Sequence, residues 1–162
     1  MPRKKHIVLA FDPGFERLGV AVVAKEGGKD VLLYSDCIRT SASLSFPKRL
    51  QIIGIAAEEV LRKWEPHAVA LESIYFEKNA KTAMGVAQVK GVLSYIAARN
   101  DLPIFEYTPL QVKVATTGYG KSDKRAVSLM VGRLVTLPQR KRFDDELDAI
   151  AIGLTCLASH KF

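Results

Sequence analysis

Four carboxylates stand at positions where a metal-dependent reaction would need them. Asp12 follows the apolar run IVLAF, and Glu72 follows the apolar run AVAL. Asp145 and Asp148 are three residues apart, a spacing that places both side chains on one face of a helix. Asp148 is the least expected of them, because the stretch DDELDAIAIGLTCLA is almost wholly apolar after its first turn, and burying an unpaired carboxylate is costly.

Acids at the ends of two apolar strands and on an apolar helix favour one shared cluster. Divalent cations relieve the repulsion within such a cluster, and oxygen-only ligands favour Mg²⁺ or Mn²⁺ over zinc. The three histidines are scattered along the chain without zinc spacing. Two cations roughly 4 Å apart would activate a water molecule and stabilise the leaving 3′-oxygen during in-line attack on a phosphodiester. The four acids therefore predict a phosphodiesterase centre.

Each acid also has a plainer role when it is considered singly. Asp12 would serve the turn that follows it, Glu72 would lie in a loop, and the helix acids would interact with the helix N-terminus. The convergence of all four is what favours the metal site. Two acids on the same turn compete with Asp145: Asp144 also suits a helix cap, and Glu146 lies about 100° from Asp145 around the helix.

Hydrophobic periodicity and turn signals divide the chain into the elements of one domain, residues 1–162. Strands are expected at 6–11, 20–25, 31–40, 68–72 and 102–107, and helices at 46–64, 79–99, 109–116, 122–136 and 144–159. This order predicts an α/β fold with a five-stranded mixed sheet, its first three strands antiparallel and helices on both faces. It matches the ribonuclease H-like fold, in which the first and fourth strands are neighbours and would bring Asp12 and Glu72 together. It also resembles the first half of an actin-like ATPase domain, but 162 residues leave no room for the second half.

Charge and composition point to a polyanionic partner outside a membrane. The net charge is +7, from 24 Lys and Arg against 17 Asp and Glu, which favours nucleic acid. No uncharged apolar run reaches the roughly 18 residues of a membrane span, and MPRKKH lacks the apolar region of a signal peptide, so a cytoplasmic location is expected. Cys37 and Cys156 are expected to be buried free thiols.

Aromatic and basic residues flank the expected centre. Tyr75 and Phe76 follow Glu72 closely, and at least one of them is expected to be exposed and able to stack on a base. The loop TGYGKSDK lacks the spacing of a P-loop, and Ser122 within it is expected to cap the next helix. Basic side chains expected to neutralise phosphates are Lys78, Lys81, Lys90, Lys113, Lys121, Lys124, Arg125 and the RKR run at 140–142.

The sequence resembles the RuvC family of Holliday junction resolvases over residues 7–156. The matching segments, in family order, are LAFDPGFERLGVAVV, CIRT, LESIYFEKNAKTAMGVAQVKGV, FEYTPLQVK, TGYGKSDKRAV and DELDAIAIG. The resemblance implies a homodimeric, Mg²⁺-dependent crossover junction endodeoxyribonuclease acting in DNA recombination and repair. Such an enzyme makes paired symmetric nicks in four-way junction DNA and leaves 5′-phosphate and 3′-hydroxyl ends. A branch-migration motor of the RuvA and RuvB type is an implied partner.

The resemblance also implies roles for individual residues. The catalytic metal ligands would hold two Mg²⁺, for which Mn²⁺ can substitute, and are Asp12, Glu72, Asp145 and Asp148. Tyr75, with Phe76 beside it, would wedge a base at the junction centre, and Lys113 and Lys124 would belong to the DNA-binding surface. The chain has Tyr75 where the family more often has Phe, and Cys156 where members often carry His.

The helix expected at 79–99 is rich in small residues, which permit close approach of another helix. A four-way junction has two-fold symmetry and needs two symmetric cuts, so a C2 dimer through this helix would supply two matching sites. Two other functions stay open: a non-catalytic nucleic-acid-binding module of the same fold, and a related nuclease acting on RNA or on flap DNA. A carboxylate centre alone does not choose among these substrates.

Overall fold

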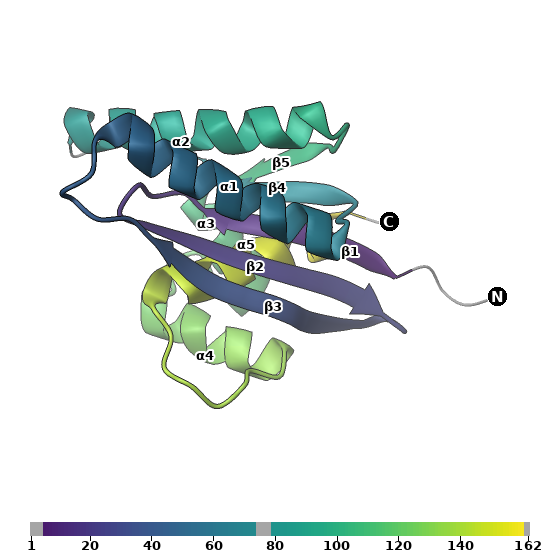
Figure 1. The fold of residues 1–162 in the computed structure, drawn as a ribbon. Helices are drawn as coiled ribbons and strands as arrows, with labels where there is room; N and C mark the ends of the chain where they lie inside the picture. Colours follow the sequence, from purple (N-terminus) through teal and green to yellow (C-terminus); the bar gives the residue numbers. More distant parts are fainter. Residues whose placement is uncertain (1–4, 74–78, 161–162) are drawn as a thin grey trace.

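A computed structural model of the chain describes residues 5–73 and 79–160, and its strands form one mixed sheet with the order β3-β2-β1-β4-β5 (Figure 1). β1, β2 and β3 are antiparallel, whereas β4 pairs parallel to β1 and β5 pairs parallel to β4. The elements are β1 (His6–Asp12), β2 (Arg17–Glu26), β3 (Lys29–Arg39), α1 (Phe46–Trp64), β4 (Ala68–Glu72), α2 (Ala80–Arg99), β5 (Ile104–Tyr107), α3 (Pro109–Thr117), α4 (Lys124–Leu134) and α5 (Asp144–Ser159). The predicted α/β class and the antiparallel arrangement of the first three strands are confirmed.

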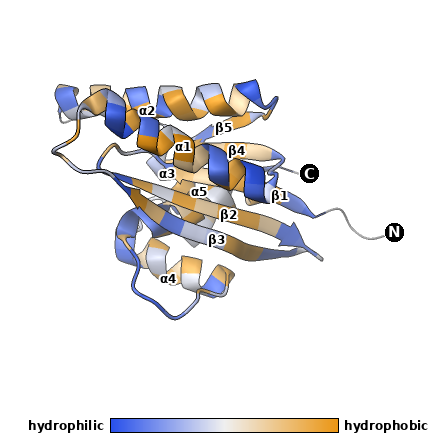
Figure 2. Cartoon of the chain, viewed as in Figure 1, coloured by the Kyte–Doolittle hydropathy of each residue, from blue (hydrophilic) through white to orange (hydrophobic). Residues whose placement is uncertain are grey.

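Helices cover both faces of the sheet, with α1 and α2 on one face and α3, α4 and α5 on the other (Figure 1). Successive residues of a strand point to opposite faces, and both sets in β1 are buried: Leu9 and Phe11 pack in the layer with α1 and α2, and Val8 and Ala10 pack in the layer with α5. This two-sided burial explains why the central strands β1, β2 and β4 are apolar along most of their length and do not alternate with polar residues (Figure 2).

α5 lies closer to the sheet than a side-chain layer normally allows. A Cβ at Gly153 would lie 2.7 Å from Cγ2 of Val23, and a Cβ at Gly19 would lie 1.9 Å from the carbonyl oxygen of Asp145. Glycine at these two positions therefore lets the helix backbone approach β1 and β2 directly. The start of α5, which carries two of the four acids, is consequently placed against β2 near the end of β1.

One expected helix cap is wrong. The helix expected from residue 122 begins at Lys124, and the N-cap is Asp123, whose side chain accepts a hydrogen bond from the Ala126 amide at 2.8 Å. The hydroxyl of Ser122 instead lies 2.7 Å from that of Thr117, at the end of α3. Aspartate caps a helix as well as serine does, so local preference did not distinguish the two positions.

Both cysteines are free, as expected, but only Cys156 is fully buried. Cys37 is partly exposed because it lies on β3, an edge strand. Within residues 5–73 and 79–160, no helix has the length and apolar character needed to cross a membrane.

Gly19→Ala is expected to lower the free energy of unfolding by about 1–3 kcal/mol, because the added methyl group would overlap the Asp145 carbonyl and push the start of α5 away from β2. Chemical denaturation measures the change. Gly132→Ala is the matched control, since its Cβ would meet only the Leu137 side chain at 3.8 Å. Unchanged stability in Gly19→Ala would contradict the close approach of helix and strand.

Candidate active site

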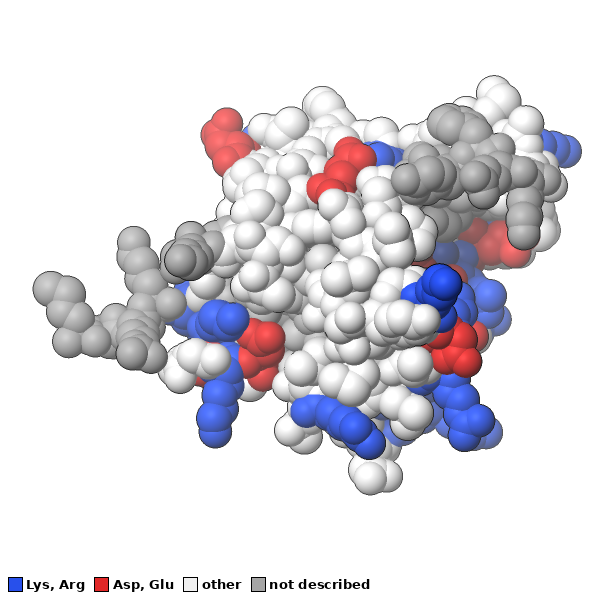
Figure 3. Space-filling view, turned by 180° about the vertical axis from the view of Figure 1, so that it is seen from behind, with Lys and Arg blue, Asp and Glu red and all other residues white. Residues whose placement is uncertain are grey.

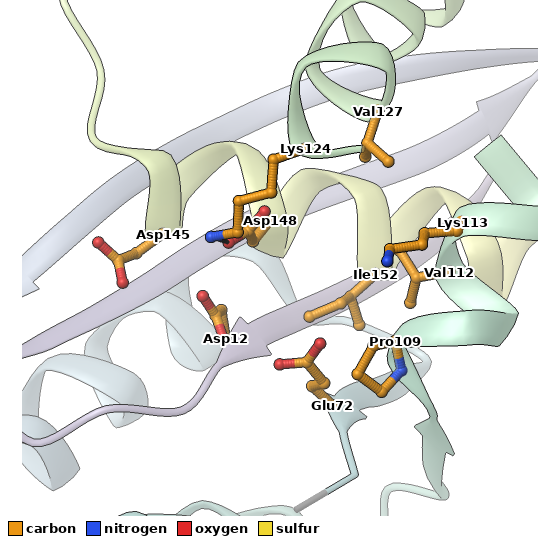
Figure 4. Close-up of a pocket in the computed structure, with 10 residues that line it drawn as sticks. All are labelled: Asp12, Glu72, Pro109, Val112, Lys113, Lys124, Val127, Asp145, Asp148 and Ile152. Carbon is orange, nitrogen blue, oxygen red and sulfur yellow. Dashed lines mark hydrogen bonds and ion pairs between the residues drawn. The ribbon is translucent and has the colours of Figure 1, made fainter. Parts of the chain in front are cut away.

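The four acids singled out in the sequence line one pocket of about 370 Å³ (Figure 4). Asp12 ends β1 and Glu72 ends β4, and the parallel pairing of these two strands brings their carboxyl ends to the same edge of the sheet. Asp145 and Asp148 reach the pocket from α5. The remaining lining residues come from α3, α4 and α5 and are Pro109, Val112, Lys113, Lys124, Val127 and Ile152. Carboxylates far apart in the sequence thus share one partly apolar recess.

A buried arginine holds the turn that follows Asp12. The side chain of Arg49, on α1, is almost fully buried and donates hydrogen bonds to Thr40 Oγ1 at 2.8 Å and to the carbonyl oxygen of Phe15 at 3.3 Å. Its guanidinium also lies 5.0 Å from the centre of the Phe15 ring. The turn is therefore tied to α1, which restrains the backbone directly after Asp12. Sequence reasoning missed this residue because nothing in its neighbourhood separates it from other helix arginines.

Burial and repulsion from neighbouring acids raise the pKa values of Asp12, Glu72 and Asp148. Burial is the larger cause for Asp12, and the neighbouring charges, Glu72 foremost, raise its pKa further, to about 8. Burial and then the charge of Asp148 raise the pKa of Glu72, although a hydrogen bond with Asp12 opposes the rise. Burial also raises the pKa of Asp148. The site as a whole therefore favours binding protons or cations.

Two basic side chains partly offset this charge. Lys124 Nζ lies 3.2 Å from Asp148 Oδ2, so the acid in the apolar helix does have a partner, supplied by α4 rather than by its own neighbours. Arg17 Nε lies 3.2 Å from Asp145 Oδ2, yet that buried oxygen accepts no hydrogen bond of regular geometry from the described residues. Charge compensation around the acids is thus incomplete.

The donor chemistry of the pocket suits a divalent cation. Its acids offer only oxygen, one buried carboxylate oxygen lacks a regular hydrogen bond, and the raised pKa values show that positive charge is favoured there. In the described part of the chain, no three His, Cys, Asp or Glu side chains already stand close enough together to hold one ion. The side chains would consequently have to draw inward around a cation.

Of the three neighbouring acids at the start of α5, only Asp145 lines the pocket. Glu146 is only 1% exposed and turns toward β3, where it accepts a hydrogen bond from Ser35 Oγ at 2.6 Å and forms an ion pair with Arg140. Arg142 Nε lies 3.5 Å from the same carboxylate. Glu146 and two arginines of the RKR run therefore anchor the start of α5 to β3, whereas Asp144 is exposed to solvent.

The residues expected to bind DNA are only partly placed by the structure. Lys113 and Lys124 line the pocket, and Lys121 and Arg125 are exposed beside the start of α4. Tyr75, Phe76 and Lys78 lie outside the described residues. In the view of Figure 3, basic side chains lie beside acidic ones at both the left-hand and the right-hand edges, while the middle of the face is mostly uncharged. The charges thus lie around the rim of this face.

The sequence and the fold of the chain are both similar to those of one protein family. The family model described as crossover junction endodeoxyribonuclease RuvC matches residues 8–156. A relative of that name from Ruminiclostridium cellulolyticum is 39% identical and covers 96% of this chain and 93% of its own, and one from Thermosipho melanesiensis is 42% identical over 93% of this chain and 96% of its own. The solved structure of Thermus thermophilus RuvC in complex with Holliday junction substrate has a TM-score of 0.89 and 34% identity, covering 95% of this chain and 94% of that chain.

The free energy of unfolding of the metal-free protein is expected to fall as the pH rises from about 4 to about 8. Unfolded Asp12 ionises near its ordinary pKa of 3.8, whereas folded Asp12 has a pKa of about 8, so the unfolded chain binds fewer protons across this window. Each unit of difference contributes about 1.4 kcal/mol. Denaturation in chelator at about pH 5 and about pH 8 measures the effect. Asp12→Asn should lose most of it, and a wild-type stability that does not change with pH would count against the repulsion.

Proposed function

The chain belongs to the RuvC family of crossover junction endodeoxyribonucleases, and from that premise we propose that it is a Holliday junction resolvase. Its reaction is the symmetric nicking of opposed strands in four-way DNA junctions. The observation that carries the proposal is the meeting of acids from β1, β4 and α5 in one pocket whose walls also carry lysines. The structure of a relative bound to Holliday junction substrate supports this choice of substrate.

We propose Asp12, Glu72, Asp145 and Asp148 as the catalytic acids and as the ligands of Mg²⁺ or Mn²⁺, with two ions in each site. When bound, the ions supply the positive charge that activates a water molecule and stabilises the leaving oxygen. The chain itself holds the acids on rigid elements: two strand ends and one helix buried along most of its length. Two observations support this proposal. The negative charge of the acids is only partly neutralised by neighbouring basic side chains, and the pKa values of Asp12, Glu72 and Asp148 are raised.

Basic side chains around the pocket are proposed to bind the phosphodiester backbone. Lys113 and Lys124 lie in the pocket wall, so a phosphate placed near the acids would be within reach of both. Lys121 and Arg125 extend this positive charge along the start of α4, and Lys78 is proposed to extend it further. Tyr75 and Phe76 are proposed to contact a base at the junction centre, which fits their position in the sequence three and four residues after Glu72.

A homodimer is proposed through α2. Met84 and Tyr95 are 62% and 65% exposed, and Gly91 between them lies on the same helix face, where a Cβ would meet nothing within 4 Å. This apolar, closely approachable face suits a second copy of the chain. A two-fold dimer would present two pockets to the two opposed strands of a junction. Association with a branch-migration motor of the RuvA and RuvB type, and a cytoplasmic location, are also proposed from family membership.

Cleavage of a synthetic four-way junction tests the proposed function, with linear duplex, flap DNA and RNA in parallel. Paired symmetric nicks are expected in the four-way junction only, with Mg²⁺ and not with chelator. Asp12→Asn should slow cutting by more than about 100-fold while junction binding is kept, because it removes a proposed metal ligand. Asp30→Asn is the control, since that acid pairs with Lys25 at the opposite end of the sheet. Junction binding without cutting would instead identify a non-catalytic module, and equal cutting of flap DNA or RNA would identify a different nuclease.

The dimer is tested by sedimentation at micromolar concentration. Wild-type protein should sediment as a dimer and Gly91→Glu as a folded monomer, because the new charge would enter the α2 face without meeting any atom of its own subunit. Gly132→Glu, on α4, should remain dimeric. A wild-type monomer, or a Gly91→Glu dimer as stable as the wild type, would argue against association through α2.

A further inference from the structure

Two arginines and one phenylalanine form a cluster beside the pocket that none of the roles described above explains. Phe143, the residue before α5, is 39% exposed. The guanidinium carbon of Arg17 lies 5.6 Å from the centre of its ring, and that of Arg39 lies 5.4 Å away. Arg17 and Arg39 are direct cross-strand partners at the ends of β2 and β3 nearest the pocket. The three residues are called the Arg17–Arg39–Phe143 cluster below.

The charges in this cluster are not needed to hold the sheet together. Like charges directly opposite one another on antiparallel strands are destabilising. The aromatic ring offsets this repulsion, because each guanidinium is attracted to the face of the Phe143 ring. Arg17 also has Asp145 within 3.2 Å, but Arg39 has no ion-pair partner within residues 5–73 and 79–160. The Phe143 ring therefore holds the exposed Arg39 guanidinium in place, and no acid in the described part of the chain neutralises its charge.

The cluster lies next to the pocket, so the Arg39 guanidinium is close to the proposed catalytic acids. Arg17 contacts Asp145, which lines the pocket at the end opposite Lys113 (Figure 4). Lys113 and Lys124 come from α3 and α4, whereas the cluster comes from β2, β3 and the start of α5. A DNA strand crossing the acids would thus meet Lys113 on one side and the cluster on the other, with Lys124 among the acids beside Asp148 (Figure 4). The planar donors of arginine suit phosphate oxygens, and the exposed ring offers a surface for a sugar or base.

We propose that the Arg17–Arg39–Phe143 cluster is a second contact site for the DNA strand being cut, and that it binds backbone phosphate next to the scissile one. Arg39 supplies the principal phosphate contact, because no acid among the described residues competes for its guanidinium. Phe143 holds both guanidiniums in place and packs against the sugar or base of the same nucleotide. This inference rests on the proposed function, since it names a further contact of that same pocket with its DNA substrate.

Salt dependence of junction binding tests the cluster. Dissociation constants are measured for a synthetic four-way junction in chelator, where no cutting occurs, over a series of salt concentrations. Arg39→Gln should weaken binding several-fold at low salt and reduce the slope of log Kd against log salt by about 0.9, the value of one phosphate contact. Phe143→Leu should weaken binding while most of the slope is kept, because it removes stacking and not charge. Arg62→Gln is the matched control, since this exposed arginine lies on α1, across the sheet from α5.

The possible results distinguish a failure of the proposed cluster contact from a failure of the proposed function. If Arg39→Gln and Arg62→Gln both keep the wild-type slope and affinity, the cluster only braces the start of α5 and the inference is overturned, even though the wild-type protein binds and cuts junctions. Denaturation of each variant shows whether an affinity loss merely reflects unfolding, and a lost affinity with an unchanged slope would also overturn the phosphate contact. If the wild-type protein fails to bind four-way junctions, the proposed function itself fails and the inference falls with it.

Discussion

Repulsion among four carboxylates in one recess is the constraint on which the rest of the structure depends. The acids come from two strand ends and a helix, and burial raises the pKa of three of them. Lys124 and Arg17 offset only part of the charge. A site of this kind stays assembled only if the surrounding core is stable without it. The two buried layers on either side of the sheet supply that stability.

The anchors that hold the acids lie outside the pocket. Glu146, Arg140 and Ser35 tie the start of α5 to β3, and Arg49 ties the turn after Asp12 to α1. These contacts restrain the backbone next to the acids without placing more charge in the recess. The acids therefore stay close together despite their mutual repulsion. As a result, the pocket favours the binding of positive charge. A DNA phosphate brought to such a site would need cations beside it, and the phosphate contacts proposed for Lys113 and Lys124 meet the same requirement.

Much of the arrangement was predictable from sequence because it follows from local patterns. Apolar runs ending in Asp12 and Glu72 marked the strand ends, and the i, i+3 spacing of Asp145 and Asp148 marked one helix face. The partner of Asp148 was not predictable, because Lys124 reaches it from another helix. The burial of Glu146 likewise depends on arginines and a strand brought together only by folding. The prediction that Ser122 caps α4 was wrong because the neighbouring Asp123 has an equal preference for the N-cap position.

All four carboxylates of the pocket are proposed to be ligands of divalent cations. Anomalous scattering from a crystal grown with Mn²⁺ tests this proposal most directly, because the map locates the ions independently of any activity. Strong peaks are expected between the carboxylates of Asp12, Glu72, Asp145 and Asp148, with these side chains closer together than they are in Figure 4. Peaks bound elsewhere, or a pocket without manganese at saturating Mn²⁺, would contradict it.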